Sequence, residues 1–350
     1  MTCPWTSTRS IRLVPLLATA AVTLLLPCSA LADEVLVRNG DRLSGDVIRQ
    51  EKRRLHLKTT YAGTVEISWK DVREVQFDEP GQVLLDDETV LTVEAVSREG
   101  DRLTLHRQGP AAAVTVDASR VKVIEPEPWE LGQGRKLEGR VNVAFEEESG
   151  NSASTEFDLD FHVNRRWRWH RIESYGEIEY DTTRGVDSSD DWTWLSNYNR
   201  LFRSRWYGSA LTLLKHDRFA DLRLRFLAGP AAGYRFFDTE PLSLAVEAGV
   251  FYLNDDFVTR PDEEFWGPAW WVDYSQKIWK ERMQIYHRQL GFAAGNDSRK
   301  QLWRSWTGIR VPLVAGFVGS VEYEFDYDSQ PAVEAETTDK TLRLKLGYKW

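Results

Sequence analysis

The chain has 350 residues with 54 acidic and 45 basic side chains, which give a formal net charge of −9 at pH 7. This acidic balance, without a basic stripe, excludes nucleic acid as an expected partner. Beyond the first 32 residues no apolar run approaches the roughly 20 residues that a membrane-spanning helix needs. We therefore expect any passage through a membrane to use strands.

Residues 1–32 have the pattern of a secretory signal peptide. Arg9 and Arg12 precede an apolar stretch over residues 13–26, and the pattern predicts cleavage between Ala32 and Asp33. An uncleaved N-terminal membrane anchor is the alternative. Both cysteines lie inside this segment, so the predicted mature chain has no disulfide, and loss of the two arginines lowers its net charge from −9 to −11.

Residues 33–124 are predicted to form a small β region with an internal repeat of about 48 residues. Short strand-like segments follow turn signals such as Asn39-Gly40 and Glu99-Gly100. The repeat favours two SH3-like barrels or one fused β sandwich. We expect either a periplasmic docking module, for peptidoglycan or another periplasmic partner, or a passive stalk or plug. The corresponding apolar positions are Val35, Leu43, Leu55 and Leu57 with Val83, Leu91, Leu103 and Leu105.

Residues 125–136 are predicted to be a linker, because prolines at alternate positions in Glu125-Pro-Glu-Pro128 favour an extended backbone. Residues 137–350 then contain about twelve strand-like segments of 9 to 14 residues, in which apolar and polar side chains alternate. Segments of this length and pattern are typical of tilted membrane strands. The sequence therefore predicts an all-β protein, with an antiparallel barrel in the outer membrane of a Gram-negative bacterium.

Connection lengths predict how the barrel is oriented. Outer-membrane barrels have short periplasmic turns and longer external loops. This asymmetry predicts that the chain enters and leaves the barrel in the periplasm, on the same side as the β region. Short turns are expected near residues 166–167, 204–205, 238–241, 280–281 and 314–315. Longer polar links are expected at 149–154, 184–191, 259–264, 296–300 and 330–339.

The final strand has one apolar and one polar face. Its polar face carries Arg343, Lys345 and Lys349. We expect it to close the barrel against the segment that begins at Leu137, and its aromatic end to be the signal that the barrel assembly machinery reads. The apolar face consists of Leu342, Leu344, Leu346, Tyr348 and Trp350.

The polar faces of the strands are expected to line the lumen. Opposed acidic and basic side chains there indicate either a narrow pore with a transverse field or an ion-pair network that fills the barrel. The acidic candidates are Asp158, Asp160, Glu177, Glu179, Glu322, Glu324 and Asp326, and the basic candidates are Arg223, Arg225, Arg343 and Lys345.

Several motifs of the barrel region occur in the same order in a known family. They are Lys215-His-Asp-Arg-Phe219, Ser243-Leu-Ala-Val-Glu-Ala-Gly249, Tyr323-Glu-Phe-Asp-Tyr-Asp328 and Leu346-Gly-Tyr-Lys-Trp350. Through them, residues 137–350 resemble the YdiY-type outer-membrane proteins, a salt-induced family of unknown function (DUF481). The resemblance implies an outer-membrane β-barrel and no catalytic residues, since the family has no established activity.

No other pattern predicts a chemical site. His162, His216 and His287 lie in strands, but no spacing pairs them with a serine, so a lipid hydrolase is the least favoured alternative. Acidic clusters at 187–191, 254–256 and 262–264 lack the spacing of a calcium loop. We expect no enzymatic activity, cofactor or metal, and we expect membrane lipid and lipopolysaccharide to surround the apolar face. The many tryptophans after residue 160 fit an interfacial girdle.

Overall fold

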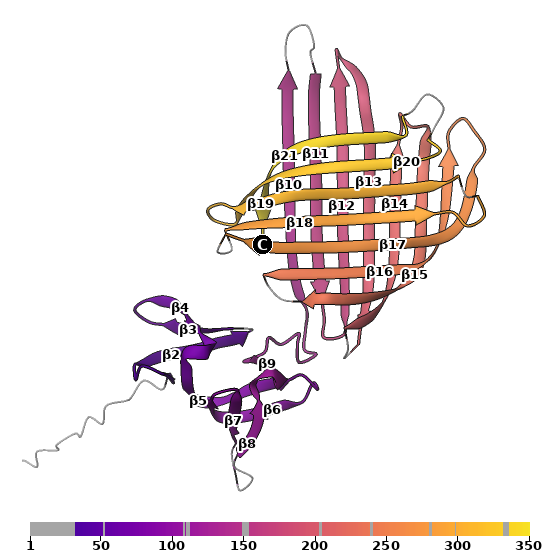
Figure 1. Ribbon diagram of the computed structural model, residues 1–350. Helices are drawn as coiled ribbons and strands as arrows, with labels where there is room; N and C mark the ends of the chain where they lie inside the picture. The colour runs from indigo at the N-terminus through magenta and orange to yellow at the C-terminus, as the bar shows by residue number, and fades with distance from the viewer. Residues whose placement is uncertain are drawn as a thin grey trace, which may run out of the picture.

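The computed structural model describes residues 32–51, 53–107, 109, 113–148, 154–202, 205–238, 241–279, 282–297, 299–331 and 336–350. The predicted signal segment therefore lies outside the described residues, except for Ala32. The described residues form twenty-one strands and two 3₁₀ turns (Figure 1). Among them, no helix is long and apolar enough to span a membrane.

The first nine strands form one sheet in the order β4-β3-β2-β1-β5-β6-β7-β8, and β9 pairs with β2 and β5. A 3₁₀ turn precedes β5 and another precedes β9. The strands are β1 (Asp33–Val37), β2 (Arg42–Glu51), β3 (Arg54–Thr59), β4 (Gly63–Ser68), β5 (Val72–Leu85), β6 (Val90–Glu99), β7 (Arg102–His106), β8 (Ala113–Asp117) and β9 (Val121–Ile124).

The pattern of strands in this sheet repeats along the chain. β2 begins at Arg42 and β6 begins at Val90, 48 residues later. The two copies share one core, because buried side chains of both copies form a single apolar cluster. They also exchange pairings: Val75 of the first copy pairs with Val96 of the second, while Ile124 of the second pairs with Gln50 of the first. The region is thus one fused unit rather than two separate barrels.

The linker packs against this unit. Arg49 in β2 donates to both carboxylate oxygens of Glu130, at 2.6 and 3.0 Å, and Glu130 is 7% exposed. The barrel also contacts the unit: Arg168, in the turn after β11, donates to the Glu88 carbonyl oxygen at 3.2 Å. These bonds hold the β region next to one end of the barrel.

The remaining twelve strands form a closed antiparallel barrel, which confirms the predicted fold and strand number. Several strands are longer than expected and reach 16 or 17 residues. They are β10 (Lys136–Glu148), β11 (Ser154–Arg166), β12 (His170–Thr183), β13 (Val186–Leu201), β14 (Trp206–Asp217), β15 (Leu222–Asp238), β16 (Leu242–Phe257), β17 (Glu263–Ile278), β18 (Met283–Ala293), β19 (Gln301–Pro312), β20 (Phe317–Asp328) and β21 (Thr338–Lys349).

The two ends of the barrel differ. We call the end that holds the start of β10, the end of β21 and the turn over 167–169 the proximal end, and the opposite end the distal end. Five proximal turns connect strands over residues 167–169, 202–205, 239–241, 279–282 and 313–316, whereas the distal link between β20 and β21 runs from 329 to 337. One expectation is wrong: residues 186–191 belong to β13, so only Arg184 and Gly185 connect β12 to β13.

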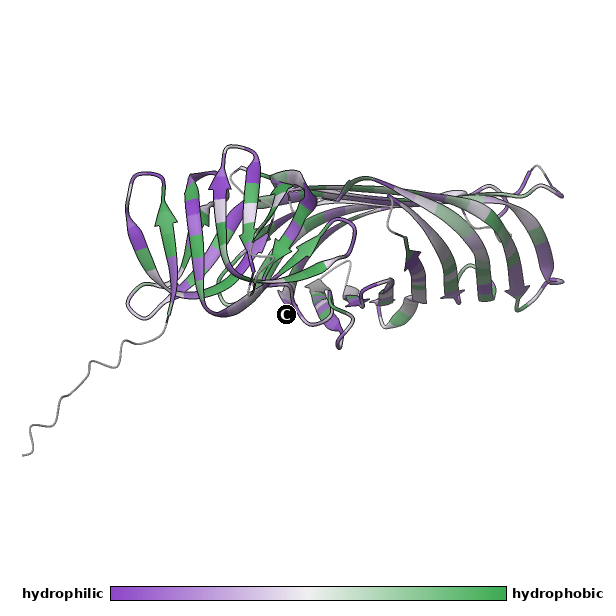
Figure 2. Ribbon diagram, turned by 90° about the horizontal axis from the view of Figure 1, so that it is seen from below, coloured by the Kyte–Doolittle hydropathy of each residue, from purple (hydrophilic) through white to green (hydrophobic). Residues whose placement is uncertain are grey.

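Side chains alternate between the two faces of the barrel wall, and hydrophobic and hydrophilic positions alternate along the strands in Figure 2. In β21, Leu344 is 75% exposed on the outer face, while the next side chain, Lys345, is 4% exposed. Leu342, Leu346, Tyr348 and Trp350 are also exposed, on the same side as Leu344. An apolar outer face of this kind matches a lipid environment.

The barrel closes at a short seam between β10 and β21. Among the described residues, only Arg140–Val143 pair with Leu346–Lys349, whereas β20 pairs with β21 over eleven positions. Gly139 and Trp350 extend the seam by exchanging backbone hydrogen bonds of 3.3 and 3.1 Å. Gly139 is required there, because a Cβ at this position would lie 2.2 Å from the Trp350 ring.

Candidate functional site

Charged side chains cross the lumen in its distal half. Arg343 of β21 bonds Asp158 of β11 at 3.3 Å and also contacts Glu179 and Glu324. Lys345, two positions along, bonds Asp160 at 2.8 Å and Glu322 at 2.7 Å. The alternation of β21 places both cations inside the barrel, and the same alternation in β11 and β20 directs the carboxylates toward them.

Contacts between opposite walls cross the lumen. β14 and β20 stand six strands apart in the ring of twelve, yet Lys215 and Asp326 form an ion pair of 3.2 Å between them. Arg304 of β19 reaches Glu177 of β12 at 2.7 Å and Thr193 of β13 at 2.7 Å. Two opposite walls can touch in this way only if side chains fill the space between them.

A buried pair of cations completes the distal network. Arg225 bonds Asp255 and Asp328, both at 2.6 Å. Lys300, fully buried, bonds the same two carboxylates at 3.0 Å. Because each buried charge has partners of opposite sign, the desolvation cost of the network is offset by its Coulomb attraction and hydrogen bonds.

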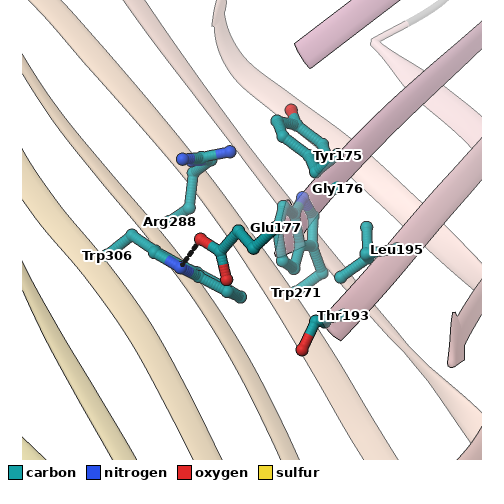
Figure 3. A pocket seen from close by; sticks show the side chains of 8 residues that line it. All are labelled: Tyr175, Gly176, Glu177, Thr193, Leu195, Trp271, Arg288 and Trp306. Carbon is teal, nitrogen blue, oxygen red and sulfur yellow. Dashed lines mark hydrogen bonds between the residues drawn. The ribbon is translucent and has the colours of Figure 1, made fainter. Parts of the chain in front are cut away.

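An apolar cluster occupies the interior beside the charges. Trp271 and Trp306 meet at 6.3 Å between ring centroids, and Trp306 Nε1 donates to Glu177 at 2.8 Å (Figure 3). A cavity of about 20 Å³ lies between these side chains, with room for about one water molecule. The other members are Leu195, Leu211, Leu213, Leu227, Phe251, Leu253, Phe265, Ala269, Leu290, Phe292 and Ala294.

Sequence reasoning missed this cluster. The assumption that all apolar side chains face lipid fails in β13 to β19, where both faces of the wall carry apolar residues. In β14, for example, Leu211 and Leu213 are buried inside and Leu214 lies on the other face. The blurred alternation over residues 191–217 was the available signal, because two apolar faces remove the contrast on which periodicity depends.

Hydrogen bonds fill part of the proximal half. Glu247, 3% exposed, accepts from Asn197 at 2.9 Å, Tyr207 at 2.9 Å and Ser209 at 2.6 Å. Nearby, Arg171 donates to Asn199. These side chains come from the inward faces of four strands, β12, β13, β14 and β16.

The structure brings together all the expected lumen residues except Arg223. That side chain is 60% exposed at the distal rim and pairs with Asp256 at 3.1 Å. The pairing of β14 with β15 is irregular between Lys215 and Asp217, so the alternation assumed from the sequence does not hold at this end of the strand.

The three strand histidines do not meet. His162 lies in the lumen and stacks on Tyr175 at 4.3 Å, whereas His287 bonds Thr307 and His216 bonds the Arg223 carbonyl oxygen. In the described part of the chain, no group of three or more His, Cys, Asp or Glu side chains is arranged to hold a metal ion.

The family described as "Protein of unknown function, DUF481" matches residues 141–350. The chain belongs to this family. The predicted DUF481 resemblance is thereby confirmed, while the finer YdiY-type assignment stays a prediction. No match was found among curated proteins.

Three solved structures illustrate what this DUF481 chain is similar to. The translocator domain of autotransporter NalP from Neisseria meningitidis is 12% identical, with 63% of this chain and 89% of that chain covered and a TM-score of 0.36. The NanC porin is 14% identical, with 61% and 100% covered and a TM-score of 0.39. CdiB from Acinetobacter baumannii is 9% identical, with 91% and 59% covered and a TM-score of 0.27.

Proposed function

We propose that this DUF481 protein is a non-enzymatic outer-membrane barrel, closed at rest, that anchors residues 33–124 at the periplasmic face of the membrane as an envelope element. The observation that carries the proposal is the set of bonds between opposite walls, above all Lys215 with Asp326 and Arg304 with Glu177. An open porin keeps its walls apart, so these contacts favour an anchor over a constitutive pore.

Planar-bilayer recording of the purified, refolded protein tests this proposal. The wild type is expected to give no stepwise ion currents. The double variant Lys215→Ala/Arg304→Ala, which removes two contacts between opposite walls, is expected to show current steps. Arg223→Ala is the matched control, since this arginine lies at the rim, and it should stay silent like the wild type.

A narrow pore is the second candidate. The side chains that cross the lumen are bonded largely by ion pairs, which water or an applied voltage can separate more readily than a packed apolar plug. Stepwise currents through the wild-type protein would support this candidate and overturn the closed-lumen proposal.

The partners we propose follow from the two parts of the chain. The apolar outer face contacts membrane lipid and lipopolysaccharide, and the barrel assembly machinery inserts the barrel. The β region has its own apolar core and is proposed to bind peptidoglycan or a periplasmic protein. A pull-down with residues 33–136 tests the last point, and failure to retain either peptidoglycan or envelope proteins would reject it.

A further inference from the structure

Three arginines lie together in the proximal lumen, and among the described residues only Arg288 of the three has an ion pair, with Glu322 at 3.5 Å. The side chain of Arg140 in β10 is buried, since the residue is only 8% exposed, and its Nε has no hydrogen-bond partner among the described residues. His162, its cross-strand partner in β11, has an unpartnered and buried Nε2. Buried polar atoms nearly always have partners, so such gaps point to a missing acceptor.

Two further arginines face the same space. Arg310 lies with its guanidinium carbon 3.5 Å from the Tyr286 ring centroid, and Arg288 lies 4.5 Å from that of Tyr175. Arg140 and Arg310 both interact electrostatically with Arg288. Three guanidinium groups within electrostatic reach of one another repel, and the Glu322 carboxylate, which all three share, offsets only part of this repulsion.

Two of the nearby carboxylates, Glu322 and Asp160, are already engaged. Glu322 is bonded by Lys345 at 2.7 Å and by the Tyr286 hydroxyl at 2.7 Å, and Arg288 reaches it only at 3.5 Å. Asp160 accepts from Asn142 at 2.6 Å and pairs with Lys345 at 2.8 Å. These two carboxylates thus bond Lys345 and, for Glu322, Arg288, whereas the Nε of Arg140 is left without an acceptor among the described residues.

We propose that Arg140, Arg288 and Arg310, together with His162, bind a small oxyanion, a carboxylate or phosphate group, in the proximal half of the lumen. Guanidinium groups match the oxygens of such anions in pairs, which a spherical chloride ion cannot reproduce. The rings of Tyr175 and Tyr286 line the arginines and limit water access, so each charge-assisted bond is strengthened. This site does not depend on whether the lumen conducts.

Equilibrium dialysis of the refolded full-length mature protein with radiolabelled inorganic phosphate tests the site. We expect saturable binding of about one phosphate per barrel at low ionic strength. If carboxylates share the site, acetate should displace the labelled phosphate at concentrations where chloride at equal ionic strength does not. If only unlabelled phosphate displaces it, the site is specific for phosphate groups. Arg140→Gln and Arg310→Gln should each weaken phosphate binding about tenfold or more.

Arg223→Gln is the matched control and should bind phosphate like the wild type, because it removes an arginine from the rim. Absence of saturable binding to the wild type, or wild-type binding by Arg140→Gln, would overturn the proposal. Heat-modifiable migration on SDS gels shows whether each variant is folded.

A stability measurement distinguishes a variant that has lost the phosphate site from one whose fold is disturbed away from the site. Without phosphate, Arg140→Gln should be at least as resistant to unfolding as the wild type, since it removes an unpaired buried charge. Saturating phosphate should raise the unfolding midpoint of the wild type more than that of the variant. A variant that is less stable in both buffers by the same amount would show a purely structural role and reject the site.

Discussion

The side chain of Arg304 illustrates how a buried charge can hold the barrel together. It bonds Glu177 and Glu324 on two different strands and is 12% exposed. Removing it leaves the Glu177 carboxylate without its ion pair and Glu324 with Arg343 alone, which is more costly than the loss of an exposed pair.

We predict that Arg304→Ala lowers the free energy of unfolding by about 3–5 kcal/mol. Arg223→Ala, which breaks only an exposed pair with Asp256, should change it by at most about 1 kcal/mol. Urea unfolding in detergent micelles, followed by tryptophan fluorescence, measures both. Equal losses for the two variants would show that burial does not decide the strength of these pairs.

Glu125 makes the β region sensitive to pH. Its burial, together with the nearby charge of Asp33, raises the pKa of this carboxyl group, although it accepts a hydrogen bond from the Gln82 backbone N–H at 2.7 Å. The folded state therefore holds the Glu125 proton more tightly than the unfolded state. Stability is greatest below the ordinary glutamate pKa and declines as the pH rises through the raised value.

We predict that Glu125→Gln stabilises the isolated region 33–136 at pH 7 by up to about 1 kcal/mol, a value kept small because the group is half-buried. The gain should vanish below about pH 4, where the wild-type carboxyl group is protonated in both states. Urea unfolding at the two pH values measures it, with the exposed Glu94→Gln as control. Destabilisation by Glu125→Gln at pH 7 would contradict the prediction.

At the scale of elements, the seam between β10 and β21 is the weakest part of the barrel wall. Beyond Val143 and Leu346 the described strands do not pair, and Leu342 and Leu344 are the most exposed apolar side chains of β21. Closure consequently depends on the few residues at the proximal end of the seam. Strand edges without partners are costly inside a bilayer.

Deletion of Trp350 should impair assembly before any other property, because it removes both backbone bonds to Gly139. We expect a clear fall in the amount of folded protein in the outer membrane, measured as the heat-modifiable band on SDS gels of membrane fractions. Normal levels of the truncated protein would refute the role of this residue.

Gly139→Ala should weaken the same seam, because its Cβ would collide with the Trp350 ring at 2.2 Å. Gly319→Ala in β20 is the matched control, since the nearest atom there lies at 3.8 Å, an ordinary contact. The folded fraction of Gly139→Ala is expected to fall below that of Gly319→Ala in the same membrane preparation. Equal fractions would mean that the ring can move aside freely.

At the scale of the whole molecule, the β region, the start of β10 and the end of β21 all lie at the proximal end of the barrel. Arg168 contacts Glu88, and Arg166 lies over the Trp129 ring at 5.0 Å, so the linker is held against the proximal end. We therefore predict that proteinase K spares residues 33–136 in intact cells and digests them after the outer membrane is permeabilised. A tag in the link between β20 and β21 should be accessible in intact cells, and the opposite pattern would invert the orientation.

The approximate number of strands and their two faces could be predicted because the alternation of apolar and polar side chains is visible within each strand. For example, the sequence alone shows that Asp158 and Asp160 lie on one face of their strand and Phe157 and Leu159 on the other, whatever the adjacent strands are. The 48-residue repeat was readable for the same reason. By contrast, Arg223 and the stretch 184–191 were misplaced, because a local irregularity and a tight turn depend on pairing across strands.

The chain by itself determined an all-β barrel with one apolar and one polar face, because side-chain period and segment length are local properties. Only the tertiary structure decided what fills that barrel. Lys215 and Asp326 are 111 residues apart and meet because β14 and β20 stand on opposite walls. Likewise, closure of the ring pairs Asp160 and Glu322 with Lys345, while the Nε of the nearby Arg140 has no hydrogen-bond partner among the described residues. Such contacts depend on strand order and register, which no single segment encodes.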